Sequence, residues 1–189
     1  IRINLLPDAE MTNKPDKIAD DHHDLLFGVR RSARYHLRRR RFYEFWHATT
    51  NFIGVVTGST AVAAVLSNSP LWAAVAGILV ALASALDLVI GTAEMARTHS
   101  DLASRFVLLE REVILAGSPT TATVRGFLAR RLEIEADEPP ILRALDRICY
   151  NELCRAMGYP SDCYKYVPWH QRRLAHWINF EPVDRPKNV

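Results

Sequence analysis

The sequence predicts an all-α protein in which a membrane-spanning helical hairpin continues, through long helices, into a cytoplasmic helical bundle. Two neighbouring apolar runs support this prediction. Residues 48–67 form a run of 20 residues without a charge, and residues 71–91 form a run of 21 whose single charge is Asp87. Roughly 18 apolar residues in succession are typical of a transmembrane helix. At about 1.5 Å per residue, each run spans the roughly 30 Å hydrocarbon core of a bilayer.

The short link between the runs, Asn68 to Pro70, requires the second helix to return antiparallel to the first. Thr, Ser and Asn side chains in the first run leave open a buried hairpin inside a soluble bundle as the alternative. The charges around the runs favour the membrane, because arginines crowd both outer ends whereas the link carries no charge. This asymmetry predicts that both termini are cytoplasmic. The arginines before the hairpin are Arg30, Arg31, Arg34, Arg38, Arg39, Arg40 and Arg41.

The residues directly before the first run are expected to lie at the lipid headgroups and to set the orientation of the hairpin. They are Arg38, Arg39, Arg40, Arg41 and the interfacial aromatic residue Trp46. Nucleic-acid binding is the disfavoured alternative, because an arginine run by itself is unspecific. No cleavable signal peptide is visible, so the first apolar helix is expected to serve as its own insertion signal.

Three parts are expected along the chain. Residues 1–20 are polar and should be extended or poorly ordered, with a helix starting at Asp20 or Asp21. Residues 21–117 should form the hairpin with its cytoplasmic extensions. Residues 118–189 should hold shorter helices at 120–136, 141–157 and 169–178, and the part after Gly158 should form an aromatic tail. Proline precedes each of these shorter helices, and Gly158 is a suitable stop for the second of them.

The second apolar helix is expected to continue without a break as far as Gly117. Apolar residues recur along it with the spacing of seven that is typical of a coiled-coil seam. We favour pairing of this seam with the first long helix of the same chain, and self-association between protomers is the alternative. The two rows of the seam are Leu88, Met95, Leu102, Leu109 and Ala116, and Thr92, His99, Phe106 and Val113.

Small and polar residues on one face of each apolar run are expected to form a pore or a helix-packing face. Small residues let helix backbones approach closely in a membrane, and hydroxyl groups can bond across helices. In the first run these residues are Thr50, Gly54, Thr57, Gly58 and Ala61. In the second run they are Gly77, Ser84, Asp87, Gly91 and Glu94.

Asp87 is the most informative single residue of this face. An ionised carboxylate in lipid is unfavourable by about 2.5–3.5 kcal/mol at the bilayer centre, so such a residue normally faces protein or water. One interpretation places Asp87 near the cytoplasmic interface, paired with His47 or an arginine. The other gives it a pore-lining or proton-sensing role, and a ring of Asp87 and Glu94 from several protomers would favour cations.

Motifs of enzymes are absent from the sequence, so neither an enzymatic activity nor a cofactor is expected. The three cysteines should be reduced thiols, since they fall in the part expected to be cytoplasmic. With His170 they match no familiar zinc spacing, and no metal site is expected. The cysteines are Cys149, Cys154 and Cys163.

The layout resembles the SLATT family, the two-transmembrane-helix effectors of bacterial nucleotide-signalling conflict systems. The resemblance covers roughly residues 21–157 and rests on LRRRRFYEFW before the hairpin, SNSP at its tip, HSDLASRFVLLEREVILAG after it and EIEADEPPILRALDRICYNE in the cytoplasmic part. It implies a homo-oligomeric effector in the bacterial inner (cytoplasmic) membrane, working with a partner system that produces a nucleotide signal. It carries over no catalytic residue.

Two functional hypotheses follow. The first is a pore-forming or membrane-disrupting effector of an anti-phage or other conflict system, gated through its cytoplasmic helices. The second is a non-conducting membrane anchor or assembly subunit that holds a partner protein through the same helices.

Overall fold

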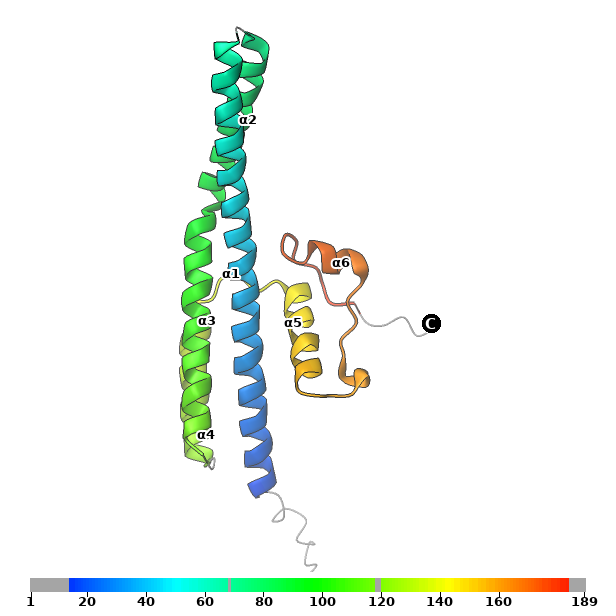
Figure 1. Ribbon diagram of the computed structural model, residues 1–189. Helices are drawn as coiled ribbons and strands as arrows, with labels where there is room; N and C mark the ends of the chain where they lie inside the picture. The colour runs from blue at the N-terminus through cyan, green and yellow to red at the C-terminus, as the bar shows by residue number, and fades with distance from the viewer. Residues whose placement is uncertain (1–13, 68, 118–119, 184–189) are drawn as a thin grey trace, which may run out of the picture.

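A computed structural model describes residues 14–67, 69–117 and 120–183, and all regular secondary structure in these ranges is helical (Figure 1). The all-α prediction is therefore confirmed. The elements in chain order are α1 (Lys14–Leu66), α2 (Pro70–Ile90), α3 (Thr92–Leu115), α4 (Thr121–Glu135), α5 (Arg143–Ala156), the 3-10 turn η1 (Ser161–Cys163) and α6 (Trp169–Leu174).

Helix α1 is the central and longest helix of the structure, and the other long helices pack against it. Its 53 residues form one continuous helix of about 80 Å, which α2 accompanies at one end and α3 at the other (Figure 1). It begins at Lys14, so the predicted start at Asp20 or Asp21 is wrong by almost two turns. Pro15 is tolerated there because the first N–H groups of a helix have no partner within it. The other residues of the predicted polar segment, 1–13, lie outside the described ranges.

The expected continuous second helix is broken at Gly91. This residue adopts φ +61°, in the left-handed region, and thereby ends α2 and begins α3. The backbone N–H of Gly91 still donates to the Asp87 carbonyl, which closes the last turn of α2. Periodicity along the sequence did not reveal the break, because the apolar pattern runs through it. The break offsets α2 from α3 along α1 (Figure 1).

Two hydrophobic cores flank the lower half of α1. On one side, Leu25 and Val29 of α1 pack against Leu102 and Phe106 of α3, with Ile134 of α4 added. Most of the seam predicted in α3 packs against α1 of the same chain, as the intrachain interpretation expects. Met95 is half-buried and Ala116 is exposed, and the buried seam residues are Thr92, His99, Leu102, Phe106, Leu109 and Val113. Leu88, which precedes the break, is 84% exposed.

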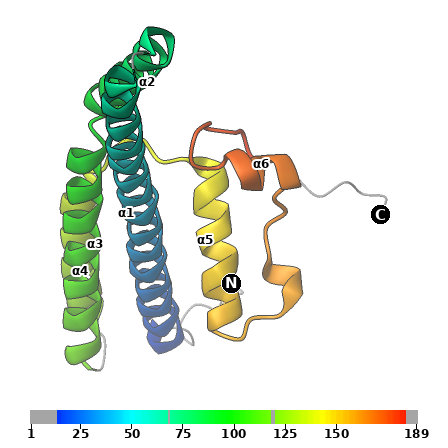
Figure 2. The same cartoon turned by 45° about the horizontal axis from the view of Figure 1, so that its top comes forward.

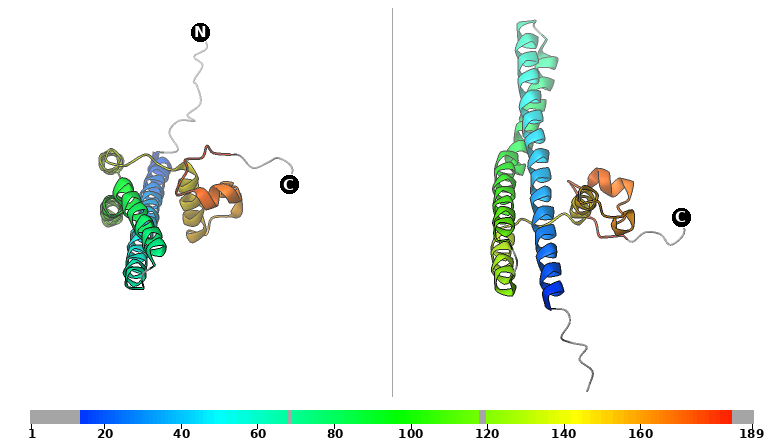
Figure 3. Two further views of the ribbon diagram at one scale, coloured as in Figure 1. Left: turned by 90° about the horizontal axis from the view of Figure 1, so that it is seen from above. Right: turned by 60° about the horizontal axis from the view of Figure 1, so that its bottom comes forward.

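The second core lies on the opposite side of α1, where α5 and α6 are placed (Figures 2 and 3). Tyr35 of α1 packs there with Leu145 and Cys149 of α5 and with Val167 and Ala175 of the following segment. The Tyr35 hydroxyl accepts a hydrogen bond from the Leu142 backbone N–H at 3.0 Å, just before α5 begins. The C-terminal segment is thus anchored to α1 by both apolar and polar contacts.

The shorter helices begin and end close to the predicted positions. Thr120 caps α4, since its side chain accepts from the Thr123 N–H. Helix α5 spans Arg143–Ala156 rather than residues 141–157, and Gly158 beyond it adopts φ +76°. Helix α6 ends at Leu174, four residues earlier than expected, and residues 175–183 after it are not helical.

Substituting glycine by alanine at two positions should have opposite effects on stability. Gly91→Ala places a side chain at φ +61° and should destabilise the fold by about 1–2 kcal/mol. Gly126→Ala lies in the interior of α4 with open space around the added methyl group, and should stabilise by up to about 1 kcal/mol. Thermal unfolding of the two variants in detergent micelles, followed by circular dichroism, measures both effects. Equal stability of the two variants would contradict this account of the break.

Candidate functional site

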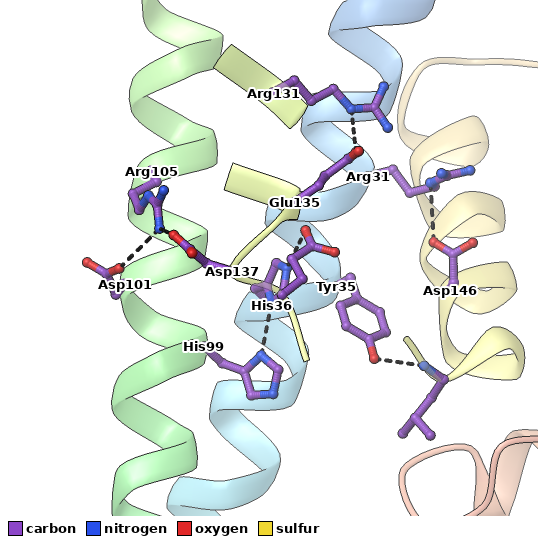
Figure 4. Close-up of polar contacts among 12 residues, drawn as sticks. Arg31, Tyr35, His36, His99, Asp101, Arg105, Arg131, Glu135, Asp137 and Asp146 are labelled. Atoms are coloured by element: carbon purple, nitrogen blue, oxygen red, sulfur yellow. Dashed lines mark hydrogen bonds and ion pairs between the residues drawn. The ribbon is translucent and has the colours of Figure 1, made fainter. Parts of the chain in front are cut away.

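Two buried histidines join α1 to α3 beside the segment that links α4 to α5. The Nδ1 atoms of His36 and His99 lie 2.9 Å apart, and His36 Nε2 lies 3.0 Å from Glu138 Oε1. Figure 4 shows the two rings pointing toward one another from the facing helices. Each histidine is 1% exposed. A single proton occupies the space between the Nδ1 atoms, because one nitrogen must donate and the other accept. A hydrogen-bonded chain thus runs from a carboxylate through two imidazoles.

Aromatic rings close this chain off from water. Phe106 stacks on His36 with 5.6 Å between ring centroids, and Tyr43 stacks on His99 at the same distance. His99 falls at a seam position, seven residues before Phe106, where an apolar side chain is usual. His99 was expected only as a seam residue, and neither His36 nor Glu138 was predicted as a site residue. A polar residue inside an apolar seam is the signal that could have led to them.

The pKa of His99 is lowered to about 3, chiefly by burial and in addition by electrostatic interaction with His36 and with the Arg39 guanidinium. His99 is therefore neutral at physiological pH. Its Nε2 atom is buried and has no hydrogen-bond partner among the described residues. A proton added to His99 would thus meet neither water nor an acceptor, and protonation should loosen the contact between α1 and α3.

Arg39 extends the polar chain toward the C-terminal segment. Its guanidinium donates to the Tyr43 hydroxyl and, at 2.8 Å, to the His176 carbonyl oxygen, and it lies 4.5 Å from the Tyr43 ring centroid. Arg39 is only 8% exposed. The structure thus places it inside the protein, away from the headgroup position expected for it, because the aromatic rings around it provide a cation–π site.

A second polar cluster lies where the hairpin meets the bundle. Asp87, the last charge of α2, accepts a hydrogen bond from the Thr92 hydroxyl across the break at Gly91. Its other carboxylate oxygen lies 3.4 Å from His47 Nδ1 on α1. The interpretation that pairs Asp87 with His47 thus agrees with the geometry. We call this cluster and the histidine chain together the polar junction; its members are His36, Arg39, Tyr43, His47, Asp87, Thr92, His99 and Glu138.

The small residues predicted on α1 all lie on the side that is sheltered in the hairpin. Thr50, Gly54, Thr57, Gly58 and Ala61 are partly buried, whereas Val55 and Val56 between them are exposed. No atom lies within 4 Å of a Cβ built at Gly54 or Gly58, so the glycines do not produce a close approach within this chain. The hydroxyls do not bond across helices as expected. Thr57 donates to the Ile53 carbonyl at 2.6 Å and Thr50 to that of Trp46 at 3.1 Å, within their own helix.

The small and polar residues predicted for the second apolar helix, which extend from α2 past the break into α3, divide between two faces. Gly77, Ser84 and Glu94 are exposed, whereas Asp87 and Gly91 are partly buried. The buried face of α2 is centred instead on Ala76, one position from Gly77. A shift of one residue rotates a helix face by about 100°, which hydrophobic spacing alone does not resolve when nearly every position is apolar.

The other predicted interfacial residues occupy different environments. Arg38 pairs with Glu152 of α5, and Arg40 pairs with Glu44 one turn further along α1. Arg41 is exposed beside a cavity. Trp46 packs edge-on against Trp177 with 5.0 Å between ring centroids, so the C-terminal segment contacts α1 just before the first apolar run.

The described residues contain no group of histidine, cysteine or acidic side chains arranged to hold a metal ion. Cys149 and Cys154 are buried and Cys163 is exposed, all as free thiols. Burial raises the pKa of the Cys149 thiol to about 12, which makes it a packing residue rather than a nucleophile. No protein-family model, curated protein or solved structure matches this chain.

Acid should destabilise the protein through His99. Its pKa is about 3 in the folded state against an ordinary value of 6.5, so the unfolded state binds more protons between these values and stability falls with falling pH. Through this one group, the free energy of unfolding should be lower at pH 5 than at neutral pH by roughly 2 kcal/mol. Thermal unfolding of the wild type and His99→Gln at pH 7.5 and pH 5 measures it, since glutamine retains an acceptor but does not titrate.

The matched control is His170→Gln, which changes an exposed histidine outside the polar junction. The pH dependence of this variant should equal that of the wild type, and that of His99→Gln should be smaller. If His99→Gln had the same pH dependence as the wild type, His99 would not be the group through which acid destabilises the protein.

Proposed function

We propose that the chain is a homo-oligomeric membrane effector that opens a pore or disrupts the membrane, gated through its cytoplasmic helices. The observation that carries this proposal is the uncovered apolar surface of two adjacent helices. Both are long and apolar enough to cross a membrane, and only 6% of the most apolar window of each is buried. The core helix of a soluble protein would be mostly covered by other elements.

The side chains on this surface are of the kind that lipid accommodates. Large apolar residues are exposed along both helices, including Phe52, Val55, Val62, Leu71, Trp72, Ile78, Leu82, Leu86 and Val89. Fully burying one such side chain is worth roughly 1.5–3 kcal/mol. The polar hydroxyls between them donate to carbonyl groups of their own helix, which satisfies them without water. Both features suit a bilayer.

The polar junction is the part of the protein suited to gating. It lies between the apolar hairpin and the bundle, and it connects Glu138, in the link between α4 and α5, to His99, while Asp87 and Thr92 span the break at Gly91. A movement of the α4–α5 link would change the partners of His36 first. Because α1 is continuous from the bundle into the hairpin, such a change can be passed to the apolar helices.

The location and partners follow from the same argument and from the resemblance to SLATT effectors. Arginines outside the hairpin and an uncharged tip favour both termini in the cytoplasm of a bacterium, with two crossings of the inner membrane. A partner system that produces a nucleotide signal would supply the trigger.

A non-conducting anchor is the second candidate function. The observation that favours it is the pairing of Asp87 with His47 and Thr92, because a carboxylate engaged in this way is not free to line a pore. In that case the hairpin holds the bundle at the membrane, and the bundle holds a partner protein.

Ion flux through the purified protein in planar bilayers separates the two candidates. A pore should carry a cation current, and Asp87→Asn should lower it by about fivefold or more, since the variant removes the charge beside the hairpin and the His47 pair. The control is Asp101→Asn, whose carboxylate is on the exposed side of α3. Absence of current in the wild type under every activating condition would leave the anchor as the function.

A further inference from the structure

A cationic cleft lies between α1 and the C-terminal segment, away from the buried histidines. It consists of two cavities of about 640 Å³ and 460 Å³, which share Arg38 and Glu152 in their walls. Small-molecule sites are typically about 300–1,000 Å³. The cleft is therefore large enough for a ligand with one or two phosphate groups.

The walls of the cleft are strongly basic. Six cationic side chains line the two cavities against the single carboxylate of Glu152, and they come from α1, α5, the segment after η1, and α6. The cations are Arg34, Arg38, Arg41, Arg155, Lys165 and Arg172. Within the described ranges, Arg38 is the one member of this set with an ion pair.

Arginines at other contacts between the helices are paired with carboxylates. Arg30 pairs with Glu110 between α1 and α3, Arg31 pairs with Asp146 between α1 and α5, and Arg105 pairs with Asp137. Each of these arginines thus has its own carboxylate, whereas in the cleft one carboxylate, Glu152, faces six cations. Burial lowers the pKa of Lys165, and the charge of nearby Arg31 lowers it further, which agrees with an excess of positive charge in this region.

Aromatic rings lie beside two of these cations and add flat surfaces. The Arg155 guanidinium lies 5.8 Å from the Tyr164 ring centroid, and Lys165 Nζ lies 4.0 Å from that of Tyr150. At the other end of the cleft, Phe42 stacks on His176 at 4.5 Å, and Phe45 is 66% exposed. Cations that are already positioned bind an anion at a lower entropic cost.

From this arrangement we propose that the cleft is a binding site for a phosphate-bearing anion. Guanidinium groups bind phosphate through paired N–H donors, and several of them converge on one space here. Arg41 and Phe45 lie within seven residues of the first apolar run, so one end of the cleft is at the boundary of the hairpin. Such an anion is available both as a lipid headgroup and as a soluble phosphate. The proposal also gives the aromatic tail a role, since Tyr164, Lys165 and Arg172 complete the cleft.

The experiment uses the full-length protein in nanodiscs and measures binding rather than conduction, so it is independent of the proposed function. In the first arm, inorganic pyrophosphate is titrated by calorimetry into protein held in phosphatidylcholine nanodiscs. In the second arm, native mass spectrometry counts the phosphatidylglycerol retained from mixed nanodiscs. Saturable binding in the first arm assigns a soluble ligand, and retention of phosphatidylglycerol in the second assigns a lipid headgroup.

Both arms compare the wild type with the double variant Arg155→Gln/Arg172→Gln, whose two side chains are exposed and not needed for the core. The double variant should bind at least tenfold more weakly, and Arg155→Lys/Arg172→Lys should regain part of the affinity. Arg111→Gln, on the exposed side of α3, is the matched control and should bind as the wild type does. Circular dichroism confirms that each variant is folded. No binding in either arm, or equal binding by the double variant, would overturn the proposal.

Discussion

The uncovered apolar surface of α2 and the adjoining half of α1 is the constraint on which the account depends. The structure brings these helices together, but the shared face is narrow and consists largely of small residues such as Ala64 and Ala76. The large apolar side chains point outward, where no element of the described chain covers them. Water is an unfavourable environment for that surface and lipid is a favourable one, which is the physical basis of the proposed membrane location.

In the bundle formed by the N-terminal half of α1 with α3, large apolar side chains are buried rather than exposed. Phe106 and Val29 are fully buried between α1 and α3, in a core of the kind found in soluble proteins. Polar groups inside that core are costly unless they are paired, and the His36–His99–Glu138 chain is paired except at one nitrogen of His99. One of the buried polar atoms without a hydrogen-bond partner among the described residues thus lies in the contact between α1 and α3.

Much of the fold could be predicted from the sequence, because the apolar runs, the seam of α3 and the proline-started helices are local patterns with strong periodicity. The break at Gly91 could not, since one glycine in an apolar run has no distinctive spacing and its left-handed φ depends on the packing of both neighbours. The predicted packing face of α2 was wrong by one residue, because nearly every position of this helix is apolar and the spacing does not single out one face. The partners His36 and Glu138 come from distant parts of the chain, 102 residues apart, and only the tertiary structure brings them together. The C-terminal wall of the cationic cleft was missed for the same reason.

The most direct test of the central claim is the state of the full-length protein in cells, measured by fractionation without detergent. Membranes are washed with alkaline carbonate and sedimented, and the protein is followed in the pellet and the supernatant. A protein whose hairpin lies in the bilayer should remain in the membrane pellet and be released only by detergent. Recovery of a monodisperse protein in the detergent-free supernatant would contradict it, because the outward-facing side chains of the hairpin would then be stable in water.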